Sequence, residues 1–180
     1  MVEQELFIIL QKHMSRMYDG KRVITMRELG NRLKKHMELL ISRYPILECC
    51  EDDIVRAYFM LEESYATNHK LLVAGNGGSA ADSEHIVGEL MKGFKLARKL
   101  NAEISQRLIN ESEELGIILA ESLQGALPAI ALDGHPALST AYMNDCEPLL
   151  CFAQQVNGYG AEGDVFLGIS TSGNSKNILY

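Results

Sequence analysis

Residues 70–90 combine a short apolar run, a glycine-rich turn and a segment with helical character, in the order KLLVAGNGGSAADSEHIVGEL. Residues 71–74 predict a buried strand, and residues 75–79 predict the turn that leads into a helix. Glycine lacks a Cβ, so a ligand can approach the backbone closely, and the first N–H groups of a helix have no partner within it. This arrangement favours an anion, and a phosphate fits it best.

A second turn of the same plan lies near the other end of the chain, where residues 164–175 read DVFLGISTSGNS. An apolar strand is again followed by a polar turn, here rich in hydroxyl groups. Hydroxyls and backbone N–H groups are neutral donors, and they can hold a phosphate dianion without a cluster of Arg or Lys. We therefore expect both turns to contact the same ligand.

His85 and Glu89 lie four positions apart in the predicted helix after the first turn. This spacing places both side chains on one face of the helix, where they can meet at a common ligand. The same spacing is also common on solvated helix surfaces, where the histidine would be structural and the glutamate an exposed carboxylate. A functional interpretation of this pair therefore depends on the glycine-rich turn beside it.

The elements that must position these residues alternate between strands and helices. Residues 127–132 and 165–169 predict two further strands, separated by a turn at 133–136, a short helix through Ala141 and a helix over 147–159. Strand and helix in alternation indicate an α/β fold, a three-layer α-β-α arrangement with a parallel sheet. Ligands in such sheets bind beyond the carboxyl ends of the strands, which is where both turns lie.

The remaining segments predict helices. Apolar residues at helical spacing indicate helices over 3–18, from Thr25 to about Tyr44, and over 46–68, and Pro45 limits the second of these. Residues 92–126 predict one long helix or two shorter helices, with the interruptions at Gly93, Gly116 and Gly125.

Composition narrows the classes of function. The net charge of −7 argues against broad nucleic-acid binding, and no apolar run is long enough for a membrane span. The first residues lack the basic start of a signal peptide, so we expect a cytoplasmic protein. Residues 1–45 hold nine Lys and Arg against five Asp and Glu. We interpret this basic region as solvated helix surface, with an interaction surface as the alternative.

The two turns also carry a resemblance to a known family. The first turn is neither a Rossmann GxGxxG site with its distant acidic residue nor a P-loop with its lysine. GNGGSAAD together with GISTSGNS resembles instead the sugar isomerase (SIS) domain family, and within it the phosphoheptose isomerase group, from about Pro45 to the last residue. The resemblance implies a flavodoxin-like SIS domain over residues 45–180, preceded by an N-terminal helical region over residues 1–44.

The resemblance also implies which residues bind a phosphosugar. In the family, the first turn lines the sugar end, the hydroxyls of the second turn hold the phosphate, and an Asn-Asp pair after the middle strand contacts the substrate. The matching residues here are Asn76, Gly77, Gly78, Ser79, Asn144, Asp145, Ser170, Thr171, Ser172 and Ser175.

The resemblance implies catalytic roles for Glu89 and His85. The family's matching glutamate moves a proton between adjacent sugar carbons through an enediol, a step for which a positioned base contributes roughly 10²- to 10⁴-fold in rate. The matching histidine and glutamate can also take part in a zinc site with two residues from a later part of the family's sequence. Since two ligands do not make a zinc site, zinc is optional here and no cofactor is required.

We therefore predict a ketose–aldose isomerase that interconverts sedoheptulose 7-phosphate and D-glycero-D-manno-heptose 7-phosphate, and that assembles as a homodimer or homotetramer. The family continues past the second turn with about two further strands and a helix that carries the catalytic acid. Residue 180 precedes these elements, so we expect the domain to be C-terminally incomplete. The alternative is a non-catalytic SIS module that binds a phosphosugar as a regulator or serves as a platform for protein assembly.

Overall fold

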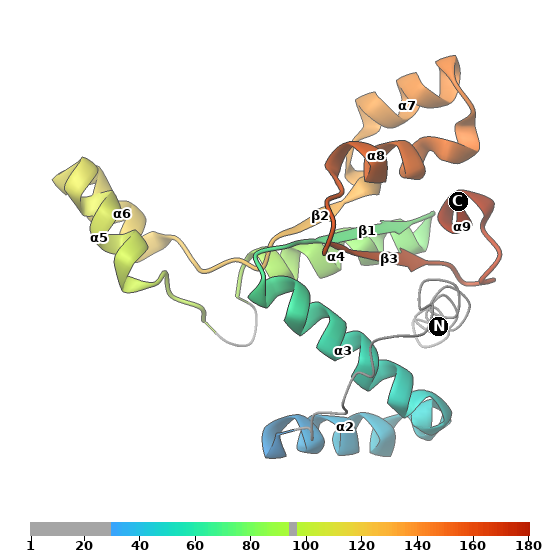
Figure 1. Ribbon diagram of the computed structural model, residues 1–180, viewed down its shortest axis with the longest axis horizontal. Helices are drawn as coiled ribbons and strands as arrows, with labels where there is room; N and C mark the ends of the chain where they lie inside the picture. Colours follow the sequence, from blue (N-terminus) through green and yellow to red (C-terminus); the bar gives the residue numbers. More distant parts are fainter. Residues whose placement is uncertain (1–29, 94–96) are drawn as a thin grey trace.

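A parallel sheet of three strands lies at the centre of the computed structural model, which describes residues 30–93 and 97–180 (Figure 1). The strands are β1 (Leu71–Gly75), β2 (Ala129–Ala131) and β3 (Val165–Ile169), in the order β2-β1-β3. β1 pairs with both neighbours and is buried throughout. The predicted α/β fold with a parallel sheet is confirmed, although β2 is shorter than expected because Leu132–Gly134 turn into a 3₁₀ helix.

Helices cover both faces of the sheet. On one face, Leu71 and Val73 of β1 pack with side chains from α3 (Glu51–Ala66) and α4 (Gly78–Met91). On the other face, Leu72 and Ala74 pack with α8 (Cys151–Tyr159) and α9 (Lys176–Leu179). Successive side chains of a strand point to opposite faces, so one apolar strand supplies both cores and fixes the three layers.

The helices before the sheet differ in part from the prediction. α2 (Asn31–Arg43) ends before Pro45 as expected, whereas its predicted start at Thr25 and the helix over residues 3–18 lie outside the described residues. The single helix expected over 46–68 is wrong, because Pro45–Cys50 form a 3₁₀ helix, η2, ahead of α3. The thiols of Cys49 and Cys50 donate to the carbonyls three residues earlier, at 3.3 and 3.2 Å, which agrees with the tighter winding.

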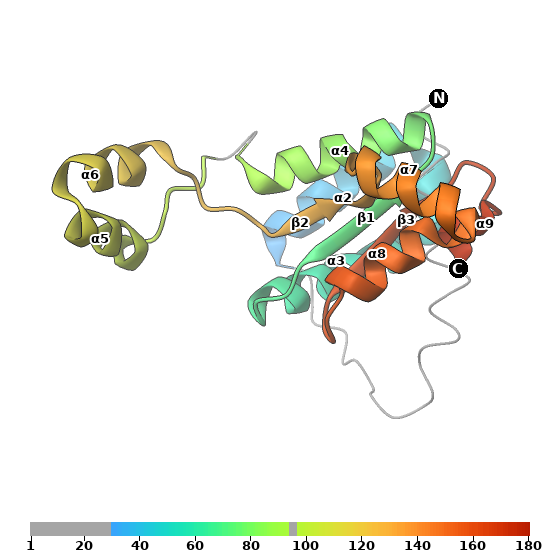
Figure 2. The same cartoon turned by 90° about the horizontal axis from the view of Figure 1, so that it is seen from above.

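The segment between α4 and β2 forms a helical hairpin that projects away from the sheet (Figures 1 and 2). It consists of α5 (Ala102–Glu111) and α6 (Glu113–Ser122), capped by the side chains of Asn101 and Ser112. Of the two predicted alternatives, one long helix or two shorter ones, the structure has the two shorter helices, but the predicted interruption at Gly116 is wrong. The break falls at Ser112, where a side-chain cap starts the second helix.

Arg98 anchors the base of this hairpin. Its Nη2 donates to the Leu90 carbonyl at 2.6 Å, at the end of α4, and its Nε donates to the Gly125 carbonyl at 2.8 Å. The last carbonyls of α4 have no partner within the helix, so a guanidinium there satisfies them.

The chain between β2 and β3 forms a helical excursion. α7 (Pro136–Asp145) runs four residues past its predicted end, and η4 (Pro148–Leu150), a 3₁₀ turn, replaces the first turn of the helix expected from Glu147. Leu149 and Leu150 of this turn are 37% and 36% exposed. In the described part of the chain, no helix has the length and apolar character needed to cross a bilayer.

Candidate functional site

The two Gly/Ser turns meet at the carboxyl ends of β1 and β3. They line a cavity of about 200 Å³. Its lining residues Asn76 and Ser175 lie almost one hundred positions apart in the sequence. The lining consists of neutral residues from both turns, namely Asn76, Ser79, Ile169, Ser170, Thr171, Ser172 and Ser175. This is the crevice where ligands bind in parallel sheets.

Glycines set the path of the first turn. A Cβ on Gly75 would lie 2.3 Å from the carbonyl oxygen of Ser79, so the chain can double back on itself here only with glycine. Gly77 has a φ of 58°, in the left-handed region that favours glycine, and α4 begins directly after it. The side chain of Ser79 is buried in the first turn of α4 and lines the cavity.

The second turn is held by its own hydroxyls. The Oγ atoms of Ser170 and Ser175 lie 2.9 Å apart, and the Asn174 N–H donates to Ser172 Oγ at 3.2 Å. Gly173 has a φ of 65°, which allows the chain to reverse between the serines. These bonds keep several hydroxyl groups at the rim of one cavity.

Two amides join the turns. Asn76 Nδ2 donates to Asn177 Oδ1 at 3.0 Å, and Asn177 Nδ2 donates to Asn76 Oδ1 at 2.8 Å. The sequence interpretation included Asn76 and missed Asn177, which lies two positions past the second motif. Its role depends on a partner 101 positions away, and no local pattern reports such a pair.

The cavity suits an anion electrostatically. None of its seven lining residues carries a charge, and its polar groups are hydroxyls and an amide. The first turn of α4 borders it and contributes the positive end of the helix dipole, while the N–H groups of Ser79 and Ala80 donate to the carbonyls of Asn76 and Gly77. Together these features provide donors and a partial positive charge, which a phosphate requires.

Glu89 and His85 lie on α4 but outside the cavity lining. Glu89 lies roughly 15 Å further along the helix axis than Ser79, at about 1.5 Å per residue. Its Oε1 is 3.8 Å from His85 Nε2, so the predicted proximity of the two side chains is confirmed. The imidazole is largely exposed, whereas Glu89 Oε2 is buried and receives no hydrogen bond from the described residues.

Asn144 and Asp145 also lie away from the cavity. They end α7, are exposed, and bond to one another, with Asn144 Nδ2 donating to Asp145 Oδ1 at 2.7 Å. In this arrangement the structure does not bring them to the two turns, and their contact with a substrate stays a prediction.

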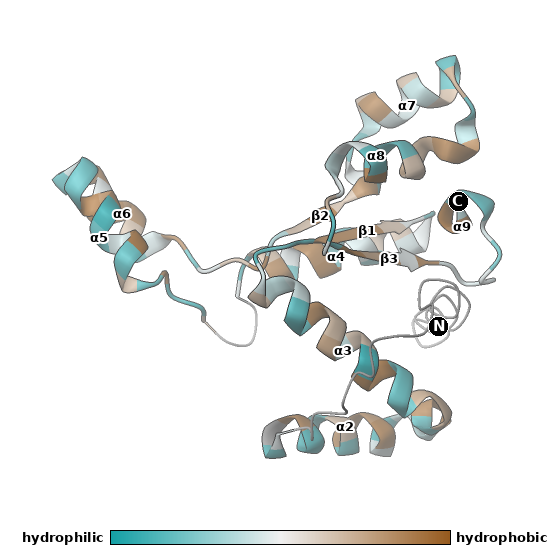
Figure 3. Cartoon of the chain, in the orientation of Figure 1, coloured by the Kyte–Doolittle hydropathy of each residue, from teal (hydrophilic) through white to brown (hydrophobic). Residues whose placement is uncertain are grey.

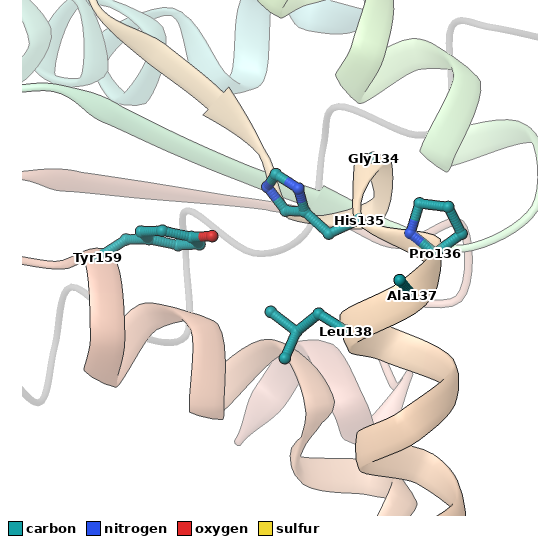
Figure 4. Close-up of a pocket in the computed structure, with 6 residues that line it drawn as sticks. All are labelled: Gly134, His135, Pro136, Ala137, Leu138 and Tyr159. Carbon is teal, nitrogen blue, oxygen red and sulfur yellow. The ribbon is translucent and has the colours of Figure 1, made fainter.

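A second cavity, of about 340 Å³, lies where β2 passes into α7 (Figure 4). The rings of His135 and Tyr159 face it with their centroids 5.7 Å apart, and Leu138 lies below them. His135 Nε2 is buried without a hydrogen bond to the described residues. This cavity is more apolar than the first and contains none of the predicted site residues.

The matched relatives share one name. No family model matches the chain. Phosphoheptose isomerase of Citrifermentans bemidjiense is 36% identical over 151 residues, which are 84% of this chain and 64% of that protein. Phosphoheptose isomerase of Geobacter sp. strain M21 is 35% identical over 153 residues, 85% of this chain and 65% of that protein. The chain is similar to phosphoheptose isomerases over most of its own length.

This similarity agrees with the family resemblance carried by the two turns. Phosphoheptose isomerase of Clostridium acetobutylicum is 40% identical over 116 residues, which are 64% of this chain and 46% of that protein. The chain thus spans about two thirds or less of the length of these relatives. The solved structure of phosphoheptose isomerase GmhA from Neisseria gonorrhoeae is 28% identical, with a TM-score of 0.48, over 82% of this chain and 58% of that one.

The zinc site implied by the phosphoheptose isomerase resemblance does not fit the described residues. His85 and Glu89 supply two donors, and residues 30–93 and 97–180 contain no group of three or more His, Cys, Asp or Glu side chains that could hold a metal ion. Zinc sites in proteins use three or four protein ligands. These two side chains alone therefore do not form one.

Proposed function

We propose that this chain binds a phosphosugar and belongs to a ketose–aldose isomerase that interconverts sedoheptulose 7-phosphate and D-glycero-D-manno-heptose 7-phosphate. The observation that carries the proposal is the single cavity lined by both Gly/Ser turns, in a chain whose relatives are named phosphoheptose isomerase. Its neutral donors match a phosphate, and its place at the carboxyl ends of β1 and β3 matches a ligand site of a parallel sheet.

The phosphate end of the substrate is assigned to the second turn. Ser170, Thr171, Ser172 and Ser175 offer hydroxyls to its oxygens, and the N-terminus of α4 adds the positive end of the helix dipole. Asn76 and Ser79 contact the sugar next to the phosphate. Gly77 and Gly78, at the start of α4, allow the ligand to approach the backbone.

Glu89 is the proposed base. It takes the proton from C1, next to the carbonyl at C2, and the carbonyl oxygen gains a proton to give the enediol. The C1 hydroxyl then loses its proton while the carbon-bound proton returns to C2, which gives the aldose. The buried, unpartnered Oε2 supports this role, because an unpaired carboxylate oxygen is costly unless another group uses it. His85, 3.8 Å away, is assigned to the same reaction centre.

The resemblance to phosphoheptose isomerases is the ground for proposing an assembled site. We assign the protein to a homodimer or homotetramer in which neighbouring copies complete the pocket.

The alternative to the isomerase function is a non-catalytic phosphosugar-binding module. One observation favours it, since the cavity is formed by the two turns alone while Glu89 and His85 lie outside its lining.

Proton exchange separates the two functions. The chain, and the longest protein that its gene encodes, are incubated with sedoheptulose 7-phosphate in deuterated water, and deuterium is followed by NMR at the carbons beside the carbonyl. We expect exchange that falls by at least about 10²-fold in Glu89→Gln, as for loss of a general base. Glu84→Gln, an exposed residue of the same helix, is the matched control and should retain exchange.

Two results would contradict the assignment. Exchange that continues at the original rate in Glu89→Gln would exclude this residue as the base. Binding of the phosphosugar by the longest protein with no exchange at all would exclude the isomerase and favour the binding module.

A further inference from the structure

The helical hairpin formed by α5 and α6 has almost no interior. Gly116 is its only buried residue, and the two helices pack mainly against each other. Five apolar side chains of the hairpin, and that of Leu123 directly after it, are between 40% and 61% exposed. The five are Ile104, Leu115, Ile117, Ile118 and Leu119. Side chains of this kind and number are typical of a surface that another element covers.

The helix lengths strengthen this argument. Each helix has ten residues, and isolated helices shorter than about 12–15 residues are marginal in water. α6 is also apolar around much of its circumference, which is typical of a buried helix (Figure 3). The hairpin therefore gains its stability from a further surface, and the sheet does not provide it, since the hairpin projects away from the sheet (Figure 2).

Charge decides between the possible partners. The hairpin carries five carboxylates, on Glu103, Glu111, Glu113, Glu114 and Glu121, against the single cation of Arg107. Two copies of the hairpin would bring these carboxylates together, and like charges at an interface are costly. A basic partner surface with exposed apolar side chains is favoured instead.

The chain itself carries such a surface on α2 and η2. Lys34, Lys35 and Arg43 of α2 are exposed, against two exposed carboxylates, Glu38 of α2 and Glu48 of η2. Leu39 is 46% exposed and Ile46, at the start of η2, is 75% exposed. α2 packs mainly on η2, and within one chain it lies well apart from the hairpin in both views (Figures 1 and 2).

We propose that the acidic hairpin of one copy docks onto the basic α2–η2 surface of a second copy. The apolar side chains of the two surfaces would be buried against each other, with Glu and Lys or Arg side chains at the rim. The lengths agree, because ten-residue helices of about 15 Å fit along the thirteen-residue α2 of about 20 Å. This proposal is independent of the isomerase assignment.

A charge exchange tests the pairing. Lys34→Glu with Lys35→Glu makes α2 acidic, and Glu111→Lys with Glu121→Lys makes the hairpin more basic at helix ends that tolerate lysine. Sedimentation velocity should show the dissociation constant of self-association rising on the order of tenfold for either variant, equivalent to about 1.4 kcal/mol. A 1:1 mixture of the two variants should restore association, because each altered surface then meets a complementary one.

The control for the hairpin variant makes the same net-charge change, +4, elsewhere on the chain. Glu63→Lys with Glu162→Lys alters two exposed residues outside both surfaces and should leave association unchanged. A wild-type chain that stays monomeric at tens of micromolar would overturn the proposal. So would a mixture of the two charge variants that does not associate more tightly than either variant alone.

Cross-linking gives a second readout that does not depend on charge. A photoreactive amino acid replaces Leu115 in an even mixture of ¹⁴N- and ¹⁵N-labelled chains, and cross-linked peptides are identified by mass spectrometry. We expect mixed-isotope peptides that join residues 113–122 to residues 31–50. Cross-links from one hairpin to another hairpin, or cross-links within single chains only, would contradict the docking of hairpin on α2.

Discussion

The amide pair of Asn76 and Asn177 is the feature that ties the two turns of the cavity together. Both hydrogen bonds of the pair are of ordinary length, at 3.0 and 2.8 Å, and they join Asn76 of the first turn to Asn177 of α9, which directly follows the second turn. A neutral hydrogen bond contributes about 0.5–1.5 kcal/mol net. The position of the first turn relative to the second therefore depends on a contact of modest strength.

Replacing Asn177 by Ala should weaken the binding of a phosphosugar. Loss of both amide bonds lets the two turns separate, and we expect the dissociation constant for sedoheptulose 7-phosphate to rise roughly 2- to 10-fold in isothermal titration calorimetry. Asn157→Ala on α8 removes an exposed asparagine and serves as the control. Equal affinity in both variants would show that the pair does not position the cavity.

At the scale of the elements, Gly116 controls how closely α5 and α6 approach. A Cβ on this residue would lie 2.2 Å from the Leu108 carbonyl oxygen and 2.5 Å from the Ile109 Cα. The sequence interpretation used this glycine as a helix break, because glycine is the commonest break in a helical pattern. In the structure Gly116 lies inside α6, where α6 closely approaches the backbone of α5.

Gly116→Ala should loosen the hairpin and leave the sheet intact. The extra methyl overpacks the crossing, which costs about 1–3 kcal/mol. Hydrogen exchange should become faster for amides of residues 102–122 and stay unchanged in β1 and β3. Gly158→Ala in α8, where a Cβ meets nothing within 4 Å, is the matched substitution. Faster exchange throughout the protein, or none in the hairpin, would contradict this account.

At the scale of the whole molecule, Asp164 fastens the start of β3 to the start of β1. Its Oδ1 accepts from the Lys70 N–H at 2.9 Å, and its Oδ2 accepts from Lys70 Nζ at 2.6 Å and from the Ala161 N–H at 2.7 Å. Burial raises the pKa of this carboxyl, but the bonds from Lys70 and Ala161 outweigh it and hold the pKa below its ordinary value of 3.8.

This lowered pKa predicts how stability depends on pH. A carboxyl with a lower pKa in the folded than in the unfolded state stabilises the fold above about pH 4, and that contribution is lost as the pH falls through the folded-state value. Asp164→Asn should therefore lower the free energy of unfolding by about 1.5–3 kcal/mol at pH 7, and by less at pH 3, in urea titrations.

The control for this pH effect is Glu162→Gln, an exposed carboxylate in the same loop, which should change stability little at either pH. A loss of stability in Asp164→Asn that is the same at pH 3 and pH 7 would exclude ionisation of Asp164 as its cause.

The sequence by itself determined the features that local pattern encodes. The apolar runs at β1 and β3 and the alternation of strand and helix predicted the parallel α/β sheet. The two Gly/Ser turns carried the family resemblance and predicted most of the cavity lining. The reason is that strand periodicity, glycine backbone freedom and helix termini act over a few residues.

Only the tertiary structure decided what depends on contacts between distant residues. It paired Asn76 with Asn177, placed Gly116 against Leu108, and set Glu89 outside the cavity that Ser79 lines. It also left the α5–α6 hairpin projecting with its apolar side chains exposed, which no composition count indicates. Such features arise from packing and long-range hydrogen bonds, whose partners are fixed when the chain folds and not by the spacing of residues along it.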